Sequence, residues 1–389
     1  MGAVSWTDGS VVVAGAGAAG IACALGLARA GAEVILIEPR ERVGGTVVHA
    51  LIHTLGGLLD GASQPLNPGL PVELEERLVA ADPDTRRRRI GRTWTLGVQP
   101  QVYAAVVAGW LTEYPQIRVW CRSRVTALSL DAVGGLTGLV AQGPAGRRDL
   151  EPAAVVDATG SAEVVRLADP RLVEPGAAVS GLVARLSGVA PDALRFPRGV
   201  ALLRKLRQSV IDGALPPACA GVWLDQGVRS DEAYLKLAVP AGDYDPAVMA
   251  AAVAALTALL GREDGFERAG LAAVGELGIR DGGAATGEYR LSADDVRAGR
   301  GFDDGLCRAD WPIEYWHPEQ GVQLEYLEAG RAYQIPRRAL KVAGVGRLWV
   351  AGKCLSADPL ARASARVVGT CWAMGAGLAQ VLTTAEATP

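Results

Sequence analysis

The stretch VVVAGAGAAG at residues 11–20 decides the fold of this chain, together with EVILIE at residues 33–38. An apolar run leads into Gly15, Gly17 and Gly20, a helical stretch follows, and the second apolar run ends on Glu38. This is the order strand, Gly-x-Gly-x-x-Gly turn, helix and strand of a βαβ unit that binds a dinucleotide. Glycines that only close a βαβ turn are the alternative, and they do not explain the acid at the end of the second strand.

Each part of this unit has a physical task. Gly15 allows the tight turn, Gly17 lets the backbone approach a pyrophosphate, and Gly20 lets helix and strand pack closely. The first turn of the helix offers free N–H groups and a positive dipole end to the phosphates. Glu38 follows at the distance of about 20 residues that is typical of an acid binding a ribose hydroxyl. The sequence therefore predicts an α/β chain with an adenine dinucleotide site.

Composition excludes several other classes. The chain has 389 residues, is 50% hydrophobic and carries a formal charge of −3, so no basic field recruits nucleic acid or anionic lipid. The apolar run at 11–28 is explained by the glycine turn rather than by a membrane span or a signal peptide. The cysteines form no C-x-x-C pair and no metal spacing, which indicates reduced thiols, no bound metal and a cytoplasmic protein; they are Cys23, Cys121, Cys219, Cys307, Cys354 and Cys371.

The segments around the βαβ unit distinguish between NAD and FAD. Residues 38–46, EPRERVGGT, resemble the segment that follows the first βαβ unit in the glutathione-reductase-like FAD superfamily, and 154–160, AVVDATG, resemble its "ATG" strand and turn. Residues 346–358 and 362–375 resemble the C-terminal signature VAG(R/K)C(I/L)SA…R…TC.AMG of an FAD-dependent oxidoreductase family. Residues 286–296 and 333–340 match two internal patterns of that family. The resemblance spans residues 11 to about 380 and implies bound FAD.

The resemblance also implies a domain plan. We expect a Rossmann-like FAD-binding domain of three layers, discontinuous in sequence at 1–165 and 331–389, with an inserted α+β substrate domain at 166–330. An Ala-rich amphipathic helix is predicted at 246–260, and 362–375 reads as one helix. No second Gly-x-Gly-x-x-Gly unit exists in the middle of the chain, which argues against a disulfide-reductase type. The expected FAD-binding residues are Gly15, Gly17, Ala18, Ala19, Gly20, Glu38, Pro39, Arg40, Gly44, Gly45, Thr46, Val125, Ala158, Thr159, Gly160, Gly352, Cys354, Arg366 and Val367.

One stretch departs from the family pattern. Relatives often carry several arginines just before the internal "G.Y.L" pattern, and here only Arg280 is present. The departure leaves family membership intact and implies a different pocket or substrate.

The candidate catalytic residues are His53, His49 and Arg92. In this superfamily the segment after the paired glycines passes close to the flavin ring, and a neutral imidazole can accept a proton as hydride leaves. Packing within an otherwise apolar segment is the competing interpretation for both histidines. Their i, i+4 spacing would place them on one helix face, but no third metal ligand is evident. Arg92 belongs to an arginine-rich stretch whose side chains either face solvent or bind an anionic substrate.

Further residues have weaker signals. Asp60 is expected to cap a turn rather than to do chemistry. Cys354 and Cys371 fall in the C-terminal signature, where they contact the flavin or simply pack, and a covalent flavin link through His or Cys stays open. By analogy with related flavoproteins, N–H groups at 363–367, at the start of the expected C-terminal helix, would point at the flavin N1 region and its O2 atom.

These observations predict an FAD-dependent oxidoreductase that removes a hydride and a proton from a small organic substrate, in a biosynthetic or tailoring role. A flavin monooxygenase using O₂ is a second candidate, although its usual C-terminal "GDAAH"-like motif is replaced here by Ser356-Ala357-Asp358-Pro359. A protein with structural, non-redox FAD and a nicotinamide dehydrogenase without flavin are the others. We expect a small-molecule partner, no nucleic acid and no membrane, and the sequence gives no signal for an oligomeric state.

Overall fold

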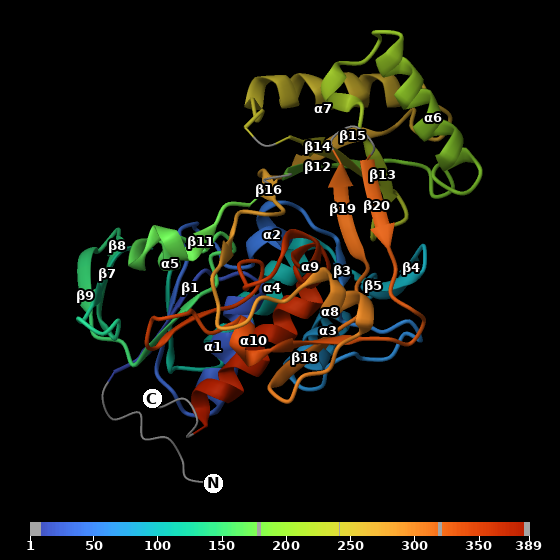
Figure 1. The fold of residues 1–389 in the computed structure, drawn as a ribbon. Coiled ribbons are helices and arrows are strands. Elements are labelled where there is room, and N and C mark those ends of the chain that lie inside the picture. The colour runs from blue at the N-terminus through green and yellow to red at the C-terminus, as the bar shows by residue number, and fades with distance from the viewer. Residues whose placement is uncertain (1–8, 177–179, 241, 318–320, 385–389) are drawn as a thin grey trace.

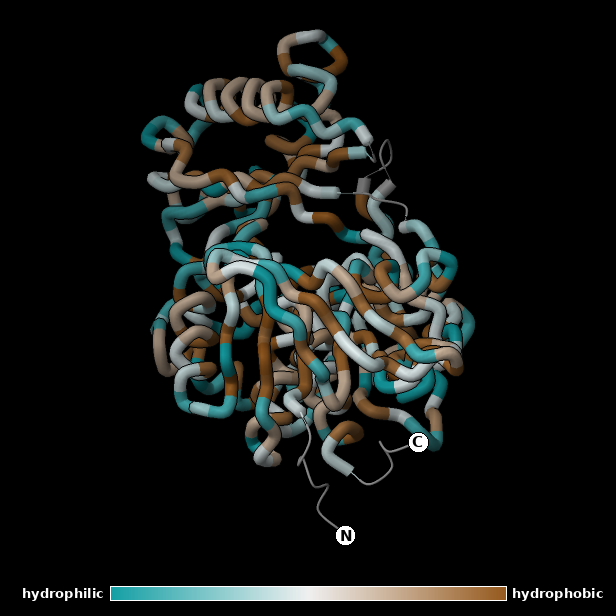
Figure 2. Tube along the Cα trace, turned by 90° about the vertical axis from the view of Figure 1, so that its left-hand side faces the viewer, coloured by the Kyte–Doolittle hydropathy of each residue, from teal (hydrophilic) through white to brown (hydrophobic). Residues whose placement is uncertain are grey.

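The computed structural model describes residues 9–176, 180–240, 242–317 and 321–384. It has a larger body that contains both ends of the described chain, and a cap that lies above it in Figure 1. Each part has its own hydrophobic core. Figure 2 shows apolar segments running through the strands of both parts, with polar segments in the connecting loops.

A five-stranded parallel sheet forms the centre of the body. Its strand order is β22-β10-β1-β2-β6, and the strands are Leu348–Val350, Ala154–Asp157, Val11–Ala14, Val34–Ile37 and Ile117–Trp120. Every neighbouring pair is parallel. The first four of these strands are fully buried, as expected for parallel strands covered on both faces. The predicted Rossmann-like α/β fold with an inserted part is confirmed.

Small residues bring two helices together beside this sheet. Helix α1 (Ala18–Arg29) packs against α10 (Val368–Thr383). A Cβ on Gly26 would lie 2.6 Å from the Cβ of Ala379, and a Cβ on Gly375 would lie 2.1 Å from the carbonyl oxygen of Ala19. The two helices therefore approach at a distance that only glycine permits at these positions.

The rest of the body surrounds this centre. An antiparallel sheet of β7 (Arg124–Leu130), β8 (Leu136–Gly143) and β9 (Gly146–Leu150) adds buried residues to the same core. A second small sheet, ordered β3-β5-β4, consists of Thr54–Gly56, Thr93–Gly97 and Arg86–Ile90. The other body elements are α2 (Gly45–His49), α3 (Leu70–Ala81), α4 (Pro100–Thr112), α5 (Glu163–Ala168), η1 (Pro170–Leu172), β11 (Val173–Glu174), β17 (Ala284–Ala285), α8 (Ala293–Ala298), β18 (Gly305–Ala309), β21 (Tyr333–Pro336), η3 (Arg337–Ala339) and α9 (Pro359–Ala365).

The cap is a mixed layer of strands and helices. Its sheet is ordered β13-β14-β12-β15, with β16 also paired to β12; these strands are Trp223–Gln226, Glu232–Val239, Ser180–Ser187, Gly270–Val274 and Gly278–Ile279. Helices α6 (Arg198–Ile211) and α7 (Pro246–Leu260) cover it, with η2 (Pro217–Cys219) beside them. The hairpin of β19 (Ile313–His317) and β20 (Gly321–Glu325) runs between body and cap in Figure 1.

Helix α7 has the bounds expected from its sequence pattern. Its buried residues recur at helical spacing, and the Asp245 side chain accepts hydrogen bonds from the N–H groups of Ala247 and Val248. Local signals are sufficient here because both the apolar face and the N-cap are encoded within the segment.

The core of the cap is built from residues between 182 and 277, whereas several residues between 284 and 313 belong to the core of the body. The boundaries 166 and 330 stay a prediction.

The expected single helix at 362–375 is wrong. The chain forms α9 and α10 with a break at Arg366 and Val367, and Val367 is extended with φ −70° and ψ 154°. The cause lies outside the segment: a Cβ on Gly369 would sit 2.3 Å from the backbone nitrogen of Leu58. Another part of the chain thus passes directly against the first turn of α10, and a sequence pattern cannot show this. The free N–H groups expected at 363–367 belong instead to the start of α10.

No helix in the described ranges is long and apolar enough to cross a membrane.

Candidate functional site

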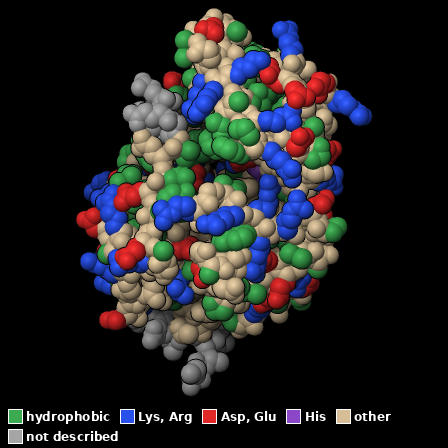
Figure 3. All heavy atoms as spheres, turned by 90° about the vertical axis from the view of Figure 1, so that its right-hand side faces the viewer, with side chains coloured by type: hydrophobic (Ala, Val, Ile, Leu, Met, Phe, Trp, Pro, Cys, Tyr) green, Lys and Arg blue, Asp and Glu red, His purple; other side chains and the backbone are tan. Residues whose placement is uncertain are grey.

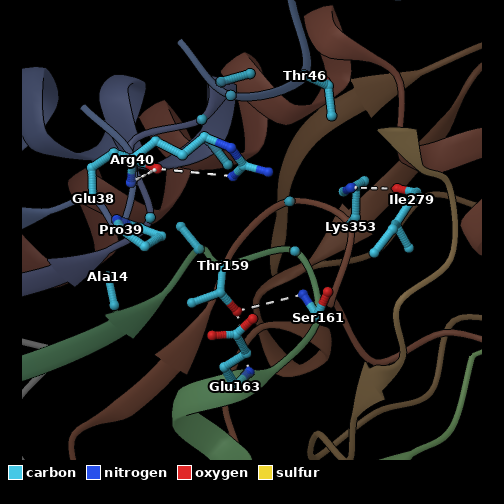
Figure 4. A pocket seen from close by; sticks show the side chains of 18 of the residues that line it. Ala14, Glu38, Pro39, Arg40, Thr46, Thr159, Ser161, Glu163, Ile279 and Lys353 are labelled. Atoms are coloured by element: carbon cyan, nitrogen blue, oxygen red, sulfur yellow. Dashed lines mark hydrogen bonds and ion pairs between the residues drawn. The ribbon is translucent and has the colours of Figure 1, made fainter. Parts of the chain in front are cut away.

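A cavity of about 230 Å³ lies at the carboxyl ends of β1, β2 and β10. Ligands of open parallel α/β sheets bind at this edge. Ala14, Glu38 and Thr159 line it from three different strand ends, as Figure 4 shows. Residues from segments distant in the sequence, among them Ile279 and Lys353, close it from other sides. We call it the nucleotide cavity.

The glycines of the first turn leave room for close approach. Gly15 has φ +102°, and a Cβ there would lie 2.4 Å from the carbonyl oxygen of Ala158. A Cβ on Gly20 would lie 1.9 Å from the carbonyl oxygen of Gly15. Gly17 faces the backbone of Gly45, since a Cβ on Gly45 would lie 2.7 Å from the Cα of Gly17. Gly17 and Gly45 together give a backbone surface free of side chains at the cavity.

The start of α1 fits a pyrophosphate. Gly17 is the N-cap residue, its position has no side-chain hydrogen bond, and the first turn contains no acid. The first N–H groups of a helix have no partner within the helix, so they are available to an anion. Ala18 and Ala19 of this first turn line the cavity.

Glu38 is held for a second contact with the nucleotide. Its side chain is buried, its Oε2 accepts the N–H of Ala16 at 2.9 Å, and its Oε1 accepts the N–H of Arg40 at 3.0 Å. Each carboxylate oxygen can accept more than one hydrogen bond, so both can still receive a ribose hydroxyl. The strand end, the glycine turn and the carboxylate thus fit an adenine dinucleotide.

Most of the predicted cofactor residues come together in this cavity. Its lining includes Gly15, Gly17, Ala18, Ala19, Glu38, Pro39, Arg40, Gly45, Thr46, Val125, Ala158, Thr159, Gly160, Gly352 and Arg366. Gly20, Gly44, Cys354 and Val367 lie outside this lining, and Val367 lines the neighbouring cavity instead. Gly44 has φ +119° and donates its N–H to the carbonyl of Ala16 at 2.8 Å, so it supports the glycine turn. Burial raises the pKa of the Cys354 thiol, whose Sγ lies 3.4 Å from the carbonyl oxygen of Asp157.

A second cavity, of about 510 Å³, opens beside the nucleotide cavity. Its walls come from the body sheet β3-β5-β4, from the cap strands β12, β13, β14 and β16, and from the β19–β20 hairpin. Most of its lining is apolar or aromatic, as is typical of small-molecule sites; these residues include Ile52, Ile90, Val183, Trp223, Ile279, Trp311, Pro312, Trp316, Val322, Leu324 and Tyr326. We call it the substrate cavity. In the space-filling view a hollow separates the upper from the lower part of the molecule (Figure 3).

The two cavities share part of their walls. Thr46, Ala50, Ile279, Lys353, Arg366 and Val368 line both. A ligand that extends along the nucleotide cavity therefore ends beside the substrate cavity, where a second molecule can touch it.

Positive charge gathers at this junction. The Lys353 Nζ donates to the carbonyl of Ile279 at 2.7 Å, and an Arg366 Nη2 donates to the carbonyl of Glu314 at 2.9 Å. Burial lowers the pKa of both side chains. The C-terminal signature contains both residues, but only Arg366 is among the residues predicted to bind FAD. Lysine is rare in this chain, which has only four, and two of them, Lys236 and Lys353, line the substrate cavity. The rarity of lysine is therefore a sequence signal that could have pointed to these two residues.

Glu314 holds two aromatic walls of the substrate cavity. Its Oε2 accepts the indole N–H of Trp311 at 2.9 Å, and its Oε1 accepts the indole N–H of Trp316 at 2.6 Å. Burial alone would raise the pKa of Glu314, but Arg366 and these hydrogen bonds bring it below its usual value. Glu314 is therefore an ionised residue that fixes the positions of the two indoles.

A buried ion pair forms the opposite wall. The carboxylate of Asp225 pairs with the ammonium of Lys236 and accepts the indole N–H of Trp223 at 2.7 Å. Burial works against ionisation, yet Lys236 and His53 lower the pKa of Asp225 to about 2. His53 lies behind this pair, with its Nε2 3.9 Å from Oδ2 of Asp225.

The structure places the three predicted catalytic residues apart. His53 is fully buried, stacks on Tyr234 with ring centroids 3.6 Å apart, and lines neither cavity. Burial lowers its pKa to about 3, so it is neutral at neutral pH. His49 lines the nucleotide cavity, with Nε2 2.9 Å from the carbonyl oxygen of Arg42. Arg92 lies over the ring of Tyr326 at 4.8 Å, outside the lining of both cavities.

The expectation that both histidines lie on one helix face is wrong. Helix α2 ends at His49, and Leu51 has φ +53°, so the chain leaves the helix before His53. Within the described ranges, no cluster of three His, Cys, Asp or Glu side chains could hold a metal ion. Asp60 caps a turn as expected, because its Oδ1 accepts the N–H groups of Ala62 and Gln64.

A Rossmann-like sheet with a nucleotide cavity at its carboxyl edge, joined to an apolar substrate cavity, defines a cofactor-dependent oxidoreductase. The model of one family, FAD dependent oxidoreductase, matches residues 10–190 and 224–388. The chain thus belongs to the FAD-dependent oxidoreductase family and is an enzyme that uses FAD. None of the curated proteins searched matches the chain.

Two solved structures support the fold. A geranylgeranyl bacteriochlorophyll reductase-like protein from Thermoplasma acidophilum is similar over 96% of this chain and 77% of that one, at 14% identity and a TM-score of 0.50. A variant of a flavin-dependent brominase is similar over 96% and 79%, also at 14% identity and a TM-score of 0.50. An anhydrotetracycline hydroxylase from Streptomyces rimosus, of whose length the chain spans 54%, matches 72% of this chain at 19% identity and a TM-score of 0.45.

Proposed function

We propose that this enzyme dehydrogenates a small organic substrate in the substrate cavity by hydride transfer to FAD. The observation that supports the proposal is the shared wall of the two cavities at Thr46, Ala50, Ile279, Lys353, Arg366 and Val368. Hydride transfer needs the donor carbon in contact with the acceptor atom, and the shared wall is where such contact can occur.

FAD, when bound, supplies the hydride acceptor. The residues of the chain supply binding, orientation and electrostatics. The open N–H groups of α1 and the Glu38 carboxylate hold the dinucleotide, and the cations Lys353 and Arg366 stabilise negative charge at the junction. The apolar walls of the substrate cavity lower the polarity around the junction.

The Asp225 wall of the substrate cavity is assigned a role in orienting the substrate. Asp225 is ionised and lines the cavity, so it can accept a hydrogen bond from the substrate directly. A carboxylate with a pKa of about 2 is too weak a base to keep the proton that the substrate loses, so this proton passes to solvent. From its place behind Asp225, His53 acts through that carboxylate as a positioning residue. His49, at the nucleotide cavity, is proposed to contact FAD rather than the substrate. Arg92 acts in substrate entry rather than at the reacting atoms, since its neighbours Gly91 and Thr93 line the substrate cavity.

The test is an anaerobic reduction experiment on the FAD-loaded protein. Candidate amines, alcohols and unsaturated acids are added without O₂, and bleaching of the flavin absorbance is followed. Bleaching by an organic substrate without any nicotinamide supports dehydrogenation. Bleaching only by NADH or NADPH, followed by O₂ consumption and oxygen insertion into the substrate, would indicate the monooxygenase alternative. No bleaching by either class of reductant would favour FAD with a structural role.

A further inference from the structure

We propose that the substrate cavity takes a flat, aromatic carboxylate, and that Arg280 is the residue that binds its carboxylate group. The inference rests on the proposed function in that it concerns the same cavity, and it adds the chemical class of the substrate.

The walls of the cavity favour a flat ring. Trp311 and Trp316 are both tied to the carboxylate of Glu314, so their indoles are fixed rather than free to rotate. Trp223 is tied in the same way to Asp225. Fixed aromatic rings around an apolar space stack well on a planar aromatic ligand and lose little conformational entropy when it binds.

Arg280 supplies an anion site beside these rings. Its guanidinium lies over the ring of Trp316, 4.0 Å from the centroid, and an Nη1 donates to the carbonyl of Ser180 at 2.6 Å. The nearby carboxylate that favours its charge is that of Glu314, whose two oxygens already accept the indole N–H groups of Trp311 and Trp316. Burial and the nearby Arg366 lower the pKa of Arg280 to about 9. A cation with a planar fork of donors, beside a carboxylate that is already hydrogen-bonded to indoles, is suited to bind a ligand carboxylate in a bidentate geometry.

The neighbouring backbone is shaped to hold this guanidinium. A Cβ on Gly181 would lie 2.6 Å from Nη2 of Arg280 and 2.9 Å from its Cζ. Gly181 is part of strand β12, so an alanine would fit the backbone there but would displace the guanidinium. Glycine at this position therefore keeps Arg280 where it is.

Charge and position assign Arg280 to the substrate rather than to FAD. Arg280 lines only the substrate cavity, whereas Lys353 and Arg366 also line the nucleotide cavity. The substrate cavity is lined by four cationic side chains, Lys236, Arg280, Lys353 and Arg366, but only by the two carboxylates of Asp225 and Glu314. Both of these carboxylates are already hydrogen-bonded to indoles. An anionic ligand restores the charge balance. In Figure 3, Lys and Arg side chains gather on the surface beside the hollow, where they attract anions.

The test compares two probes of nearly the same shape, one with a charged carboxylate and one with a neutral carboxamide. Binding of 2-naphthoate and of its neutral analogue 2-naphthamide to the FAD-loaded protein is measured by equilibrium dialysis, which needs no flavin reduction. We expect 2-naphthoate to bind at least tenfold more tightly than 2-naphthamide. Arg280→Gln should remove this difference by weakening 2-naphthoate alone, because charged hydrogen bonds are worth about 1.5–3 kcal/mol, or more than tenfold.

Two further variants control the test. Arg338→Gln removes another arginine that lies over an aromatic ring, that of Tyr289, outside the cavity, and should leave both affinities unchanged. Gly181→Ala keeps every charge but displaces the guanidinium, so it should weaken 2-naphthoate even if Arg280→Gln fails to fold. Equal affinities of the two probes, an equal loss of both in Arg280→Gln, or no binding of either probe at millimolar concentration would overturn the proposal. Tight 2-naphthoate binding without flavin bleaching by any organic substrate would overturn dehydrogenation instead.

Discussion

Glu38 is the residue on which the nucleotide cavity depends most directly. Its carboxylate accepts the N–H groups of Ala16 and Arg40 and faces the cavity at the end of β2. It therefore organises the glycine turn and offers lone pairs to the ribose through one side chain.

Glu38→Ala should weaken FAD binding at least tenfold. The substitution removes charge-assisted hydrogen bonds worth about 1.5–3 kcal/mol each and leaves the N–H of Ala16 without its partner. Titration of the apoprotein with FAD, followed by flavin fluorescence, gives the dissociation constant. Glu41→Ala is the matched control, because Glu41 pairs with Arg122 at an exposed position. Similar affinities for both variants would contradict the role of Glu38.

His53 makes the fold sensitive to acid. Its pKa is about 3 in the folded chain, because burial and Lys236 disfavour its charged form, and about 6.5 in an unfolded chain. Between these values the unfolded state binds one more proton, so stability falls as the pH decreases, by at most ~1.4 kcal/mol per pH unit. His53→Phe keeps a ring against Tyr234 and should flatten the pH dependence between pH 6 and pH 4. Urea unfolding at several pH values measures the slope, and Tyr234→Phe, which removes only a hydroxyl, should keep the slope of the parent.

Single residues also show what the sequence could and could not predict. Glu38 was identifiable because its distance from Gly20 is part of a local motif. Arg280 and Glu314 carry no such local signal, because they come from different segments and meet only after the cap and the β19–β20 hairpin fold over the body. Lys353 lies in the C-terminal signature between Gly352 and Cys354, but its place in the signature does not show that it faces the substrate cavity. Arg280 departs from a family pattern, which indicates a different pocket without showing its shape.

Among the elements, α1 and α10 carry the closest packing of the body. The glycines Gly26 and Gly375 permit a helix separation that side chains would prevent. These two helices also bring the glycine turn and the C-terminal segment to the same cavity, since the first turn of α1 and Val368 of α10 both line it.

Gly26→Ala should destabilise the protein by about 1–3 kcal/mol, the range for overpacked cores. The new methyl group would lie 2.6 Å from the Cβ of Ala379, on a neighbouring helix. Gly109→Ala is the matched control in α4: nothing lies within 4 Å of its Cβ, and alanine there should stabilise the helix by about 0.5–1 kcal/mol. Thermal or urea unfolding distinguishes the two signs, and destabilisation by both variants would contradict the packing argument.

Elements with local signals were predictable, and elements defined by contacts were not. The strands β1, β2, β10 and β22 and the helix α7 follow from apolar runs, glycine turns and one N-cap aspartate. The break between α9 and α10 depends on the backbone at Leu58, about 310 residues earlier in the chain. The β19–β20 hairpin likewise lines the substrate cavity because of where it packs, and its own sequence pattern does not indicate this.

At the scale of the whole molecule, the enzyme separates its two tasks between body and cap. The body supplies the glycine turn, Glu38 and most of the nucleotide cavity, whereas the cap supplies Gly181, Asp225, Lys236 and much of the substrate cavity. Glu276, just before β16, connects the parts: its Oε2 pairs with Nε of Arg40 at 2.7 Å, and its Oε1 lies 3.5 Å from Nδ1 of His49. Figure 1 shows the cap above the body, joined to it by the chain at β12 and β16 and flanked by the β19–β20 hairpin.

That connection makes the cap an exchangeable cassette. The chain enters through β12 and returns through β16, where Ser180 pairs with Ile279 and Gly181 with Gly278. Replacing residues 182–277 by a two-residue Asn-Gly turn would close the neck as a hairpin. Because the deletion also removes Tyr234, on which His53 stacks, the shortened body should be less stable than the parent. It should still bind FAD, as flavin absorbance retained on a desalting column would show, and loss of the flavin would contradict it. Grafting a different cap onto the same pair of strands would then change which molecules the enzyme accepts, while the FAD-binding residues of the body stay as they are.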